Sequence, residues 1–432
     1  MSTIHVIGAG LAGLSAAVTA SGAGRSVTVH EATASGGGRC RSRFDTELGI
    51  YLDNGNHLLL SGNEAAFAYL KAINALERVT GPRRPLFPFM DLRSREKWTL
   101  KPSTGLIPWW LLFSGRRVPN TSVRDYLTLA MVGRERNGRV VADAIRHNQL
   151  YSLLLEPLAI AALNTHPDVA LASLFGAVLR ETLLKGGSAC LPRVPVRGLS
   201  DALVDPAVET LRGRGARVLF NRRITGIIVE HGRAVALETA SGRVFLEPDD
   251  AIVLAVPAWV AGELLPEVTV PNAFESILNV HYRLSATPDG DVAEAGFVGL
   301  VNGTAEWIFV RPDHVSVTVS AANRLIDRQA DDLAASIWPD VVTALDLGAM
   351  ALPPFRVIKE RRATIVANAE QERRRPAAQT TIANLTLAGD WTNTKLPGTI
   401  EGAVRSGVTA ARLLLDAIPF ARPQKEVSLH DA

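Results

Sequence analysis

The chain has 432 residues, 47% of them hydrophobic and 21% charged, a composition typical of a globular protein and a length typical of two domains. The net charge is only +3, so no nucleic-acid partner is expected, and two cysteines without ligand spacing argue against a zinc site or a disulfide framework. No apolar run is long enough to span a bilayer, and no signal peptide precedes the first predicted strand. These features lead us to expect a cytoplasmic protein.

The first predicted elements form a strand–helix–strand unit. Hydrophobic periodicity predicts a strand over Thr3–Ile7, a helix over Leu11–Ala23 and a strand over Ser26–Val29, the alternation of a parallel sheet. The later predicted elements are a Gly/Arg loop at Ser35–Ser42, an apolar stretch at Leu106–Phe113, helical segments at Val123–Leu163 and Ala170–Leu184, strands at Arg217–Phe220, Ile224–Glu230, Ala234–Thr239 and Asp250–Val256, a half-exposed strand at Val315–Ser320, a buried strand at Leu385–Ala388, a helix at Ile400–Ala417 and a disordered tail after Pro419.

A glycine motif, GAGLAG at residues 8–13, joins the first predicted strand to the first predicted helix. In this context GxGxxG indicates a dinucleotide site, in which the backbone approaches a pyrophosphate at the positive helix N-terminus. Glu31 follows at the end of the second strand, where its carboxylate can accept hydrogen bonds from ribose hydroxyls.

Two further blocks indicate the same kind of site. GGGR at residues 36–39 places Arg39, a fork of donors suited to a diphosphate, beside glycines that permit close approach. LAGDWT at residues 387–392 ends a buried strand, and GTIEGA at residues 398–403 opens the last helix. Asp390 is placed to hold a ribityl or phosphate-linked group, and it is alternatively a plain turn residue.

Together these blocks resemble the GG-motif flavoproteins, which include amine oxidases and phytoene desaturases. DNGNHLLLSG at residues 53–62, Glu156-Pro157, Leu163-Asn164-Thr165 and residues 396–403 resemble more closely the squalene-associated FAD enzymes, the hydroxysqualene dehydroxylases of hopanoid synthesis. One local departure is Gly398, where alanine is expected. The resemblance implies an α/β fold: a Rossmann-like FAD-binding domain of the GG-motif type with a discontinuous α+β substrate domain.

The resemblance also implies the cofactor, the domains and the reaction. The cofactor is FAD, and the reaction is reductive dehydroxylation of hydroxysqualene to squalene. Residues 1–80, 195–270 and 380–418 are expected to form the FAD-binding domain, residues 81–194 and 271–379 the substrate domain, and residues 419–432 a tail. The residues expected to bind FAD are Gly8, Gly10, Leu11, Ala12, Gly13, Glu31, Ala32, Gly37, Gly38, Arg39, Asn54, Gly55, Asn56, His57, Ile224, Gly389, Asp390, Gly398, Thr399, Ile400 and Glu401.

Alternative functions stay open at this point. A carotenoid- or phytoene-type desaturase would use the same fold, and an amine oxidase would place aromatic residues such as Trp391 or Trp307 beside the flavin. A non-catalytic isoprenoid carrier would have eroded nucleotide motifs, whereas the motifs here are intact. No second strand–GxGxxG–helix unit is recognisable, so no NADPH domain is expected, and the sequence identifies neither an electron donor nor an oligomeric state.

Two further expectations concern catalysis and location. His57 is the candidate catalytic acid, because its ordinary pKa lies near neutrality and the resemblance places it near the flavin. Asp53, Asn54 and Asn56 would orient it or bind the hydroxyl, and the alternative is that His57 only satisfies backbone groups under the flavin. The apolar stretch Leu106–Phe113, followed by Arg116 and Arg117, predicts peripheral contact with the inner face of the cell membrane, with a buried element of the substrate domain as the alternative.

Overall fold

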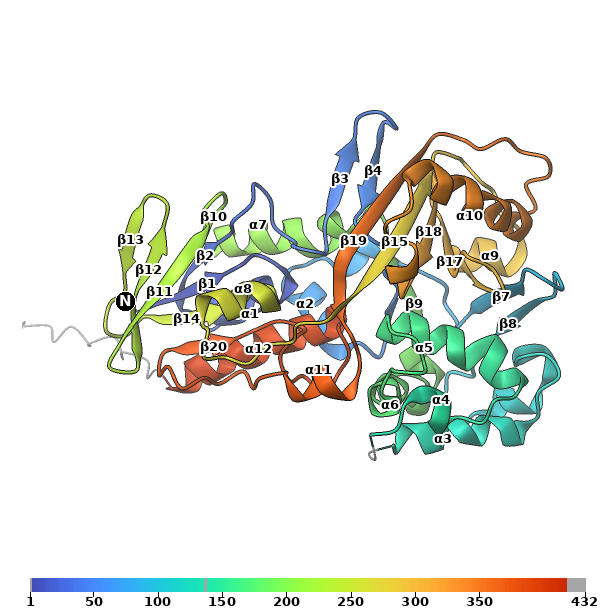
Figure 1. The fold of residues 1–432 in the computed structure, drawn as a ribbon, viewed down its shortest axis with the longest axis horizontal. Helices are drawn as coiled ribbons and strands as arrows, with labels where there is room; N and C mark the ends of the chain where they lie inside the picture. The colour runs from blue at the N-terminus through green and yellow to red at the C-terminus, as the bar shows by residue number, and fades with distance from the viewer. Residues whose placement is uncertain (1, 136–137, 418–432) are drawn as a thin grey trace, which may run out of the picture.

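A parallel five-stranded sheet forms one half of the molecule in this computed structural model, which describes residues 2–135 and 138–417 (Figure 1). The strand order is β10-β2-β1-β14-β20, and every pairing in it is parallel. The strands are β1 (Thr3–Ile7), β2 (Ser26–His30), β10 (Arg217–Leu219), β14 (Ala251–Leu254) and β20 (Leu385–Leu387). The sheet therefore joins the beginning, the middle and the end of the chain.

Helices cover one face of this sheet, and a small antiparallel sheet covers the other. On the helical face, α1 (Leu11–Gly22) packs against α12 (Ile400–Ala417), and the two helices approach so closely that a Cβ at Gly407 would collide with the Ala12 carbonyl. Both belong to an apolar cluster that also holds α2 (Glu64–Ala72) and α7 (Asp205–Gly213). The opposite face is covered by α8 (Ala258–Leu264) and by the strands β11 (Ile224–Glu230), β12 (Arg233–Thr239) and β13 (Gly242–Phe245).

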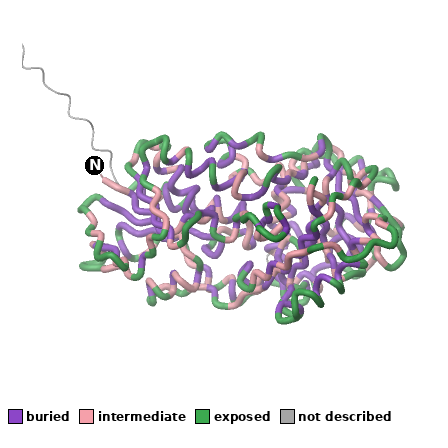
Figure 2. Tube along the Cα trace, turned by 90° about the horizontal axis from the view of Figure 1, so that it is seen from above, coloured by how far each residue is buried: buried purple, intermediate pink, exposed green. Residues whose placement is uncertain are grey.

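The other half is built on a seven-stranded mixed sheet in the order β19-β15-β18-β17-β16-β7-β8. Its strands are β7 (Phe87–Asp91), β8 (Lys97–Leu100), β15 (Phe274–Tyr282), β16 (Phe297–Val301), β17 (Trp307–Val310), β18 (Val315–Val319) and β19 (Phe355–Ile365). One face packs on α10 (Ala330–Leu345) and the other belongs to an apolar cluster with the helices of residues 127–181. Figure 2 shows buried residues running through both halves.

Smaller elements connect these layers. They are β3 (Ser42–Asp45), β4 (Ile50–Asp53), β5 (Leu59–Leu60), β6 (Val79–Thr80), α3 (Leu127–Gly133), α4 (Val141–Ala144), α5 (Glu156–Leu163), α6 (Ala172–Glu181), β9 (Pro192–Pro195), α9 (Gly290–Ala295) and α11 (Ala369–Arg373). Among them, β5 and β6 both pair with β9, which ties the chain after β4 to the segment after α6.

One prediction of local structure lacked detail and one was wrong. Residues 123–135 and 138–163 are largely helical, as predicted, but they are divided into several short helices, since Gly133 ends α3 and Pro157 lies at the start of α5. The strand at Val315–Val319 is buried at every position rather than half-exposed, because its polar residues face other buried polar groups instead of water. The predicted tail at residues 419–432 lies outside the described residues. The domain boundaries stay a prediction.

Candidate functional site

The turn from β1 into α1 leaves a helix N-terminus open to a ligand. Gly8 adopts a φ of +102°, and a Cβ there would lie 2.6 Å from the Ala255 carbonyl oxygen, so the turn requires glycine. No described side chain caps α1 at Gly10, and a Cβ at Gly10 would meet open space. The first-turn N–H groups of Leu11, Ala12 and Gly13 are therefore at a helix start that no described side chain caps, and their contact with the cofactor stays a prediction.

Glu31 lies directly after β2 and is buried. Its Oε2 accepts a hydrogen bond from the Ala9 N–H at 2.8 Å, and its Oε1 accepts from the backbone N–H and hydroxyl of Thr33 at 2.8 and 2.7 Å. The Glu31 carbonyl accepts the Arg222 N–H, which brings the chain leading to Ile224 beside Ala32. The carboxylate thus fixes the glycine turn itself, and one acceptor site of Oε2 remains for a ribose hydroxyl.

The second and third glycine blocks meet at an ion pair. The Gly37 N–H donates to the Ala9 carbonyl at 2.7 Å, which holds the GGGR loop over the start of α1. Arg39 Nη2 lies 2.5 Å from Asp390 Oδ1, so this guanidinium pairs with the carboxylate of the other block. A Cβ at Gly398 would lie 3.1 Å from Asp390 Oδ2 and 3.2 Å from Thr364 Cβ, which gives a local reason for glycine at that position.

The loop that follows β4 is held from both sides. Asn54 Nδ2 donates to Glu360 Oε2 at 3.0 Å, and Asn279 Nδ2 donates to the Asn54 carbonyl at 3.3 Å across Gly55. Asn56 Nδ2 donates to the hydroxyls of Ser316 and Thr318, at 2.7 and 2.9 Å. Asp53 is occupied elsewhere, accepting the Ser42 hydroxyl and the Leu199 N–H. The loop is therefore anchored on β15, β18 and β19.

His57 lies in this loop and keeps part of its surface accessible. Burial lowers its pKa below the ordinary value, an effect that Asp53 opposes and Arg39 reinforces. Leu58, on the same loop, and Leu60, in β5, pack against the apolar cluster on one face of the seven-stranded sheet. His57 therefore lies on the loop that connects the polar end of the sheet with this apolar cluster.

The same face of the sheet changes from polar to aromatic across its strands. Asn279 pairs with Thr318, Thr318 with Trp307, and residues paired across antiparallel strands share a face. Beyond Trp307 lie Phe89 and Trp98, stacked with their ring centroids 5.7 Å apart. This arrangement suits a ligand with one polar group on a long hydrocarbon.

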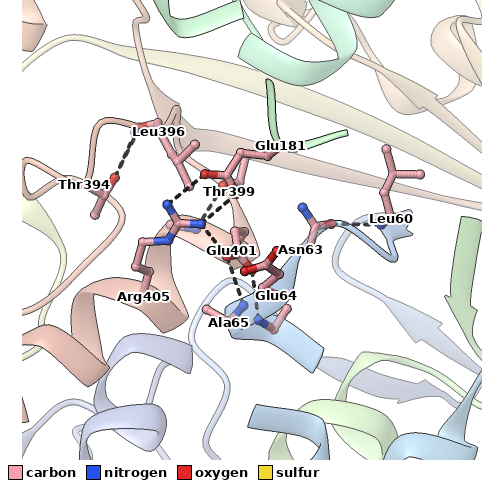
Figure 3. A network of polar contacts seen from close by, with 12 residues as sticks. Leu60, Asn63, Glu64, Ala65, Glu181, Thr394, Leu396, Thr399, Glu401 and Arg405 are labelled. Atoms are coloured by element: carbon pink, nitrogen blue, oxygen red, sulfur yellow. Dashed lines mark hydrogen bonds and ion pairs between the residues drawn. The ribbon is translucent and has the colours of Figure 1, made fainter. Parts of the chain in front are cut away.

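The N-terminal turn of α12 has two different roles (Figure 3). The Thr399 hydroxyl caps the helix by accepting the Gly402 N–H at 3.1 Å, and Ile400 is buried. Glu401 instead accepts the backbone N–H groups of Ala65 and Ala66, at 3.1 and 2.9 Å, and so caps α2. Arg405 Nη2 lies 2.8 Å from Glu401 Oε1 and 2.7 Å from Glu181 Oε2, so the guanidinium bridges the two carboxylates. The cofactor contact predicted for Glu401 stays a prediction, but its carboxylate has these protein partners.

A family model described as "flavin containing amine oxidoreductase" matches residues 11–288 and 308–415. The chain belongs to this family. It is 43% identical to the hydroxysqualene dehydroxylase of Zymomonas mobilis and 45% identical to that of Rhodopseudomonas palustris, in each case over 96% of this chain and 99% of the relative. The solved cyclohexylamine oxidase of Brevibacterium oxydans has the same fold, with a TM-score of 0.69 at 14% identity over 96% of this chain and 99% of that structure.

As a member of this family the protein is a flavoprotein with FAD as its cofactor, as the sequence predicts. The residues present fit that group, because the uncapped start of α1 and the open space at Gly10 lie directly beside Glu31. The two tryptophans considered for an amine-oxidase site are both packing residues: Trp391 donates to the Val256 carbonyl and is 2% exposed, and Trp307 packs on Phe89.

Sequence reasoning missed the partners that hold the flavoprotein's loops. Asn279, Ser316, Thr318 and Glu360 anchor the loop after β4, and Glu181 anchors Arg405, yet each lies more than 200 residues from the residue it contacts. No local motif marks them. The only available signal was the alternation of Ser, Thr and Val along Val315–Val319, which indicates a strand with one polar face.

Proposed function

We propose that this flavoprotein is a hydroxysqualene dehydroxylase, which removes the allylic hydroxyl of hydroxysqualene and yields squalene for hopanoid synthesis. The observation that carries the proposal is the identity of 43 and 45% to two hydroxysqualene dehydroxylases over 99% of their length. The site geometry supports it, because a polar loop adjoins an aromatic and aliphatic cluster able to surround a hydrocarbon.

In our proposal, several separate segments of the chain hold FAD. The start of α1, from Gly10 to Gly13, takes the diphosphate with Gly37 and Gly38 above it, and Glu31 with Ala32 and Ile224 takes the adenosine. Asp390, Gly389 and the residues from Gly398 to Ile400 take the ribityl and ring portion. Arg39 and the loop from Asn54 to His57 complete the site, with Arg39 orienting Asp390 through the ion pair.

The reaction replaces the C–O bond at the allylic carbon by a C–H bond. The allylic C–O bond breaks, a C–H bond forms, and the oxygen leaves as water after it has gained a proton. Reduced FAD supplies the hydride for the new C–H bond. The protein supplies the proton, the orientation of the hydroxyl and a dry apolar surrounding that keeps water from the allylic carbon.

We propose His57 as the group that supplies the proton to the leaving oxygen. It is partly accessible on the loop between the polar end of the seven-stranded sheet, at Asn279 and Thr318, and the apolar cluster. Because burial lowers its pKa, protonated His57 is a stronger acid than an exposed histidine but is less populated at neutral pH.

We further propose that the enzyme works at the inner face of the cell membrane, where a C30 hydrocarbon partitions. Within residues 2–135 and 138–417, no helix has the length and hydropathy to cross a bilayer. The proposal is therefore peripheral contact, and it rests on the apolarity of the substrate and product.

The decisive test is a single turnover without oxygen. The purified holoprotein is reduced with dithionite, mixed with hydroxysqualene, and analysed for squalene by gas chromatography and mass spectrometry. We expect about one squalene per reduced FAD, as one hydride per turnover requires, and none from the oxidised protein. Absence of squalene, or release of hydrogen peroxide with an amine substrate, would overturn the proposal in favour of an amine oxidase.

A further inference from the structure

Two neighbouring segments expose large apolar side chains to solvent. In the first, residues 106–113, Leu106 is 79% exposed, and Ile107, Trp109, Leu112 and Phe113 are each more than half exposed. In the second, Leu127 and Met131 of α3 are each 64% exposed, one helical turn apart on the same side of the helix. Exposed apolar side chains that gather in this way mark an interaction surface.

The two segments form one surface, called here the apolar face. The ring of Trp110 lies 5.4 Å from that of Tyr126, edge to face, which fixes the first segment on the turn leading into α3. The chain at Gly186 packs directly on Leu106, and the side chain of Leu184, itself 40% exposed, packs on Gly133 of α3. The segment 184–186 therefore links the two sets of exposed residues.

The surroundings of the apolar face are basic. Between Lys101 and Glu135 the sequence has five basic residues and two acidic ones, and of the basic residues Lys101 is paired with Asp291 at 2.8 Å. Arg116, Arg124 and Arg134 are exposed, and the Arg116 guanidinium lies over the Phe113 ring at 5.6 Å. The two acidic side chains are engaged, Asp125 with Ser122 and Asn148, and Glu135 with Arg139. An anionic partner is thus favoured around an apolar centre.

From these observations we infer that the apolar face docks on the surface of a bilayer containing anionic lipids. Tryptophan and aliphatic side chains enter the headgroup boundary while arginines meet phosphate, the combination that peripheral anchors use. A second copy of this chain fits less well, because it would bring the same basic rims together.

The buried side of the same segments connects the docking surface with the proposed substrate site, an argument that rests on the proposed function. Trp110, Leu111 and Leu129 are buried, and they belong to the apolar cluster that reaches Phe89 and Trp307 on the seven-stranded sheet. Apolar side chains are therefore continuous from the docked surface to the aromatic end of the site.

The test measures binding of the holoprotein to vesicles, without substrate. Vesicles of phosphatidylcholine with phosphatidylglycerol are compared with phosphatidylcholine alone by flotation. Trp109→Ser with Phe113→Ser is expected to weaken binding by about tenfold or more, because two side chains no longer enter the lipid. Trp110 is left intact, since it is only 5% exposed and its loss would disturb folding.

The matched control is Phe245→Ser, which removes an aromatic side chain that is 76% exposed on β13, at the opposite end of the molecule from α3 (Figure 1). This variant is expected to bind as the wild type does. Wild-type protein that does not float, or a folded double variant that floats unchanged, would overturn the inference, as would a wild-type dimer that the double variant converts to monomer. Squalene formation in detergent is scored separately, so failure of the proposed reaction and failure of docking are distinguishable.

Discussion

At the scale of single residues, Glu31 shows how one carboxylate serves the fold and the ligand together. It accepts the Ala9 N–H and two donors of Thr33, and it is buried where the glycine turn ends. A carboxylate of this kind orders the turn before the cofactor arrives. If Glu31 also binds the ribose, as we propose, its loss affects cofactor retention in two ways, through the ribose and through the turn.

We expect Glu31→Ala to weaken FAD binding by about 1–3 kcal/mol, the cost of leaving a buried donor unpaired. FAD absorbance after serial dilution and gel filtration measures it. Glu31→Gln keeps an acceptor for Ala9 and should lose less, and Glu230→Ala, on an exposed position of β11, is the control. Equal FAD occupancy in Glu31→Ala and the wild type would contradict the assignment.

His57 makes a prediction about pH. Its folded pKa is lower than the ordinary histidine value of about 6.5, so the protonated form accumulates only as the pH falls below that value. If His57 supplies the proton, the single-turnover rate of the reduced enzyme rises as the pH falls through its lowered pKa. His57→Gln should remove this dependence and slow the step, while FAD content stays normal. A Gln variant with the wild-type rate and profile would show that the acid is another group.

At the scale of elements, the capping of α2 by a residue of α12 is the clearest stabilising contact between distant parts of the sequence. Asn63, at the start of α2, provides no side-chain cap, and the Glu401 carboxylate takes its place from 335 residues away. The same carboxylate is held by Arg405, which Glu181 of α6 binds through both oxygens. Three helices from distant parts of the chain thus meet at one carboxylate (Figure 3).

We expect Glu401→Ala to lower the free energy of unfolding by about 1–3 kcal/mol, because two N–H groups of α2 lose their acceptor. Glu181→Ala is the matched variant: it breaks the pair with Arg405 but leaves the α2 cap, and Arg405 is partly exposed, so the loss should be about 1 kcal/mol or less. Urea unfolding of both variants at neutral pH measures the difference. If Glu401→Ala and Glu181→Ala lower the free energy of unfolding equally, the stabilisation comes from the ion pair with Arg405 and not from the cap of α2.

The elements that sequence could predict are those whose signals are local. The β1–α1–β2 unit and α12 follow from short-range periodicity and glycine spacing. The strand Val315–Val319 was recognised as a strand but its burial was not, since Ser316 and Thr318 look like solvent-facing residues until Asn56 is placed opposite them. Likewise Arg39 was expected to face a diphosphate, and only the fold reveals its partner Asp390.

At the scale of the whole molecule, the segments that we propose to bind FAD come from the first, middle and last parts of the chain. A ligand that binds only the folded arrangement stabilises it by mass action, by about 2.7 kcal/mol at a hundredfold excess over its Kd. We expect the apoprotein to unfold at a lower temperature than the holoprotein, with a midpoint that rises steadily as FAD is added. AMP, which would reach only the Glu31 side of the proposed site, should raise the unfolding midpoint less than FAD does. An unfolding midpoint that does not change when FAD is added would contradict the proposal that these segments bind FAD together.

The order of strands in the parallel sheet has a consequence for synthesis of the protein. Strand β14 lies between β1 and β20, and β20 with α12 is made last, more than 350 residues after β1. While a nascent chain is still attached to the ribosome, the apolar residues of α1 that α12 will cover are exposed, and so is the edge of β14. Such surfaces are those that chaperones bind and that drive aggregation. The glycine motif between β1 and α1 therefore leaves the ribosome long before α12 can cover its helix, and a chain that stops before β20 would keep these apolar surfaces exposed.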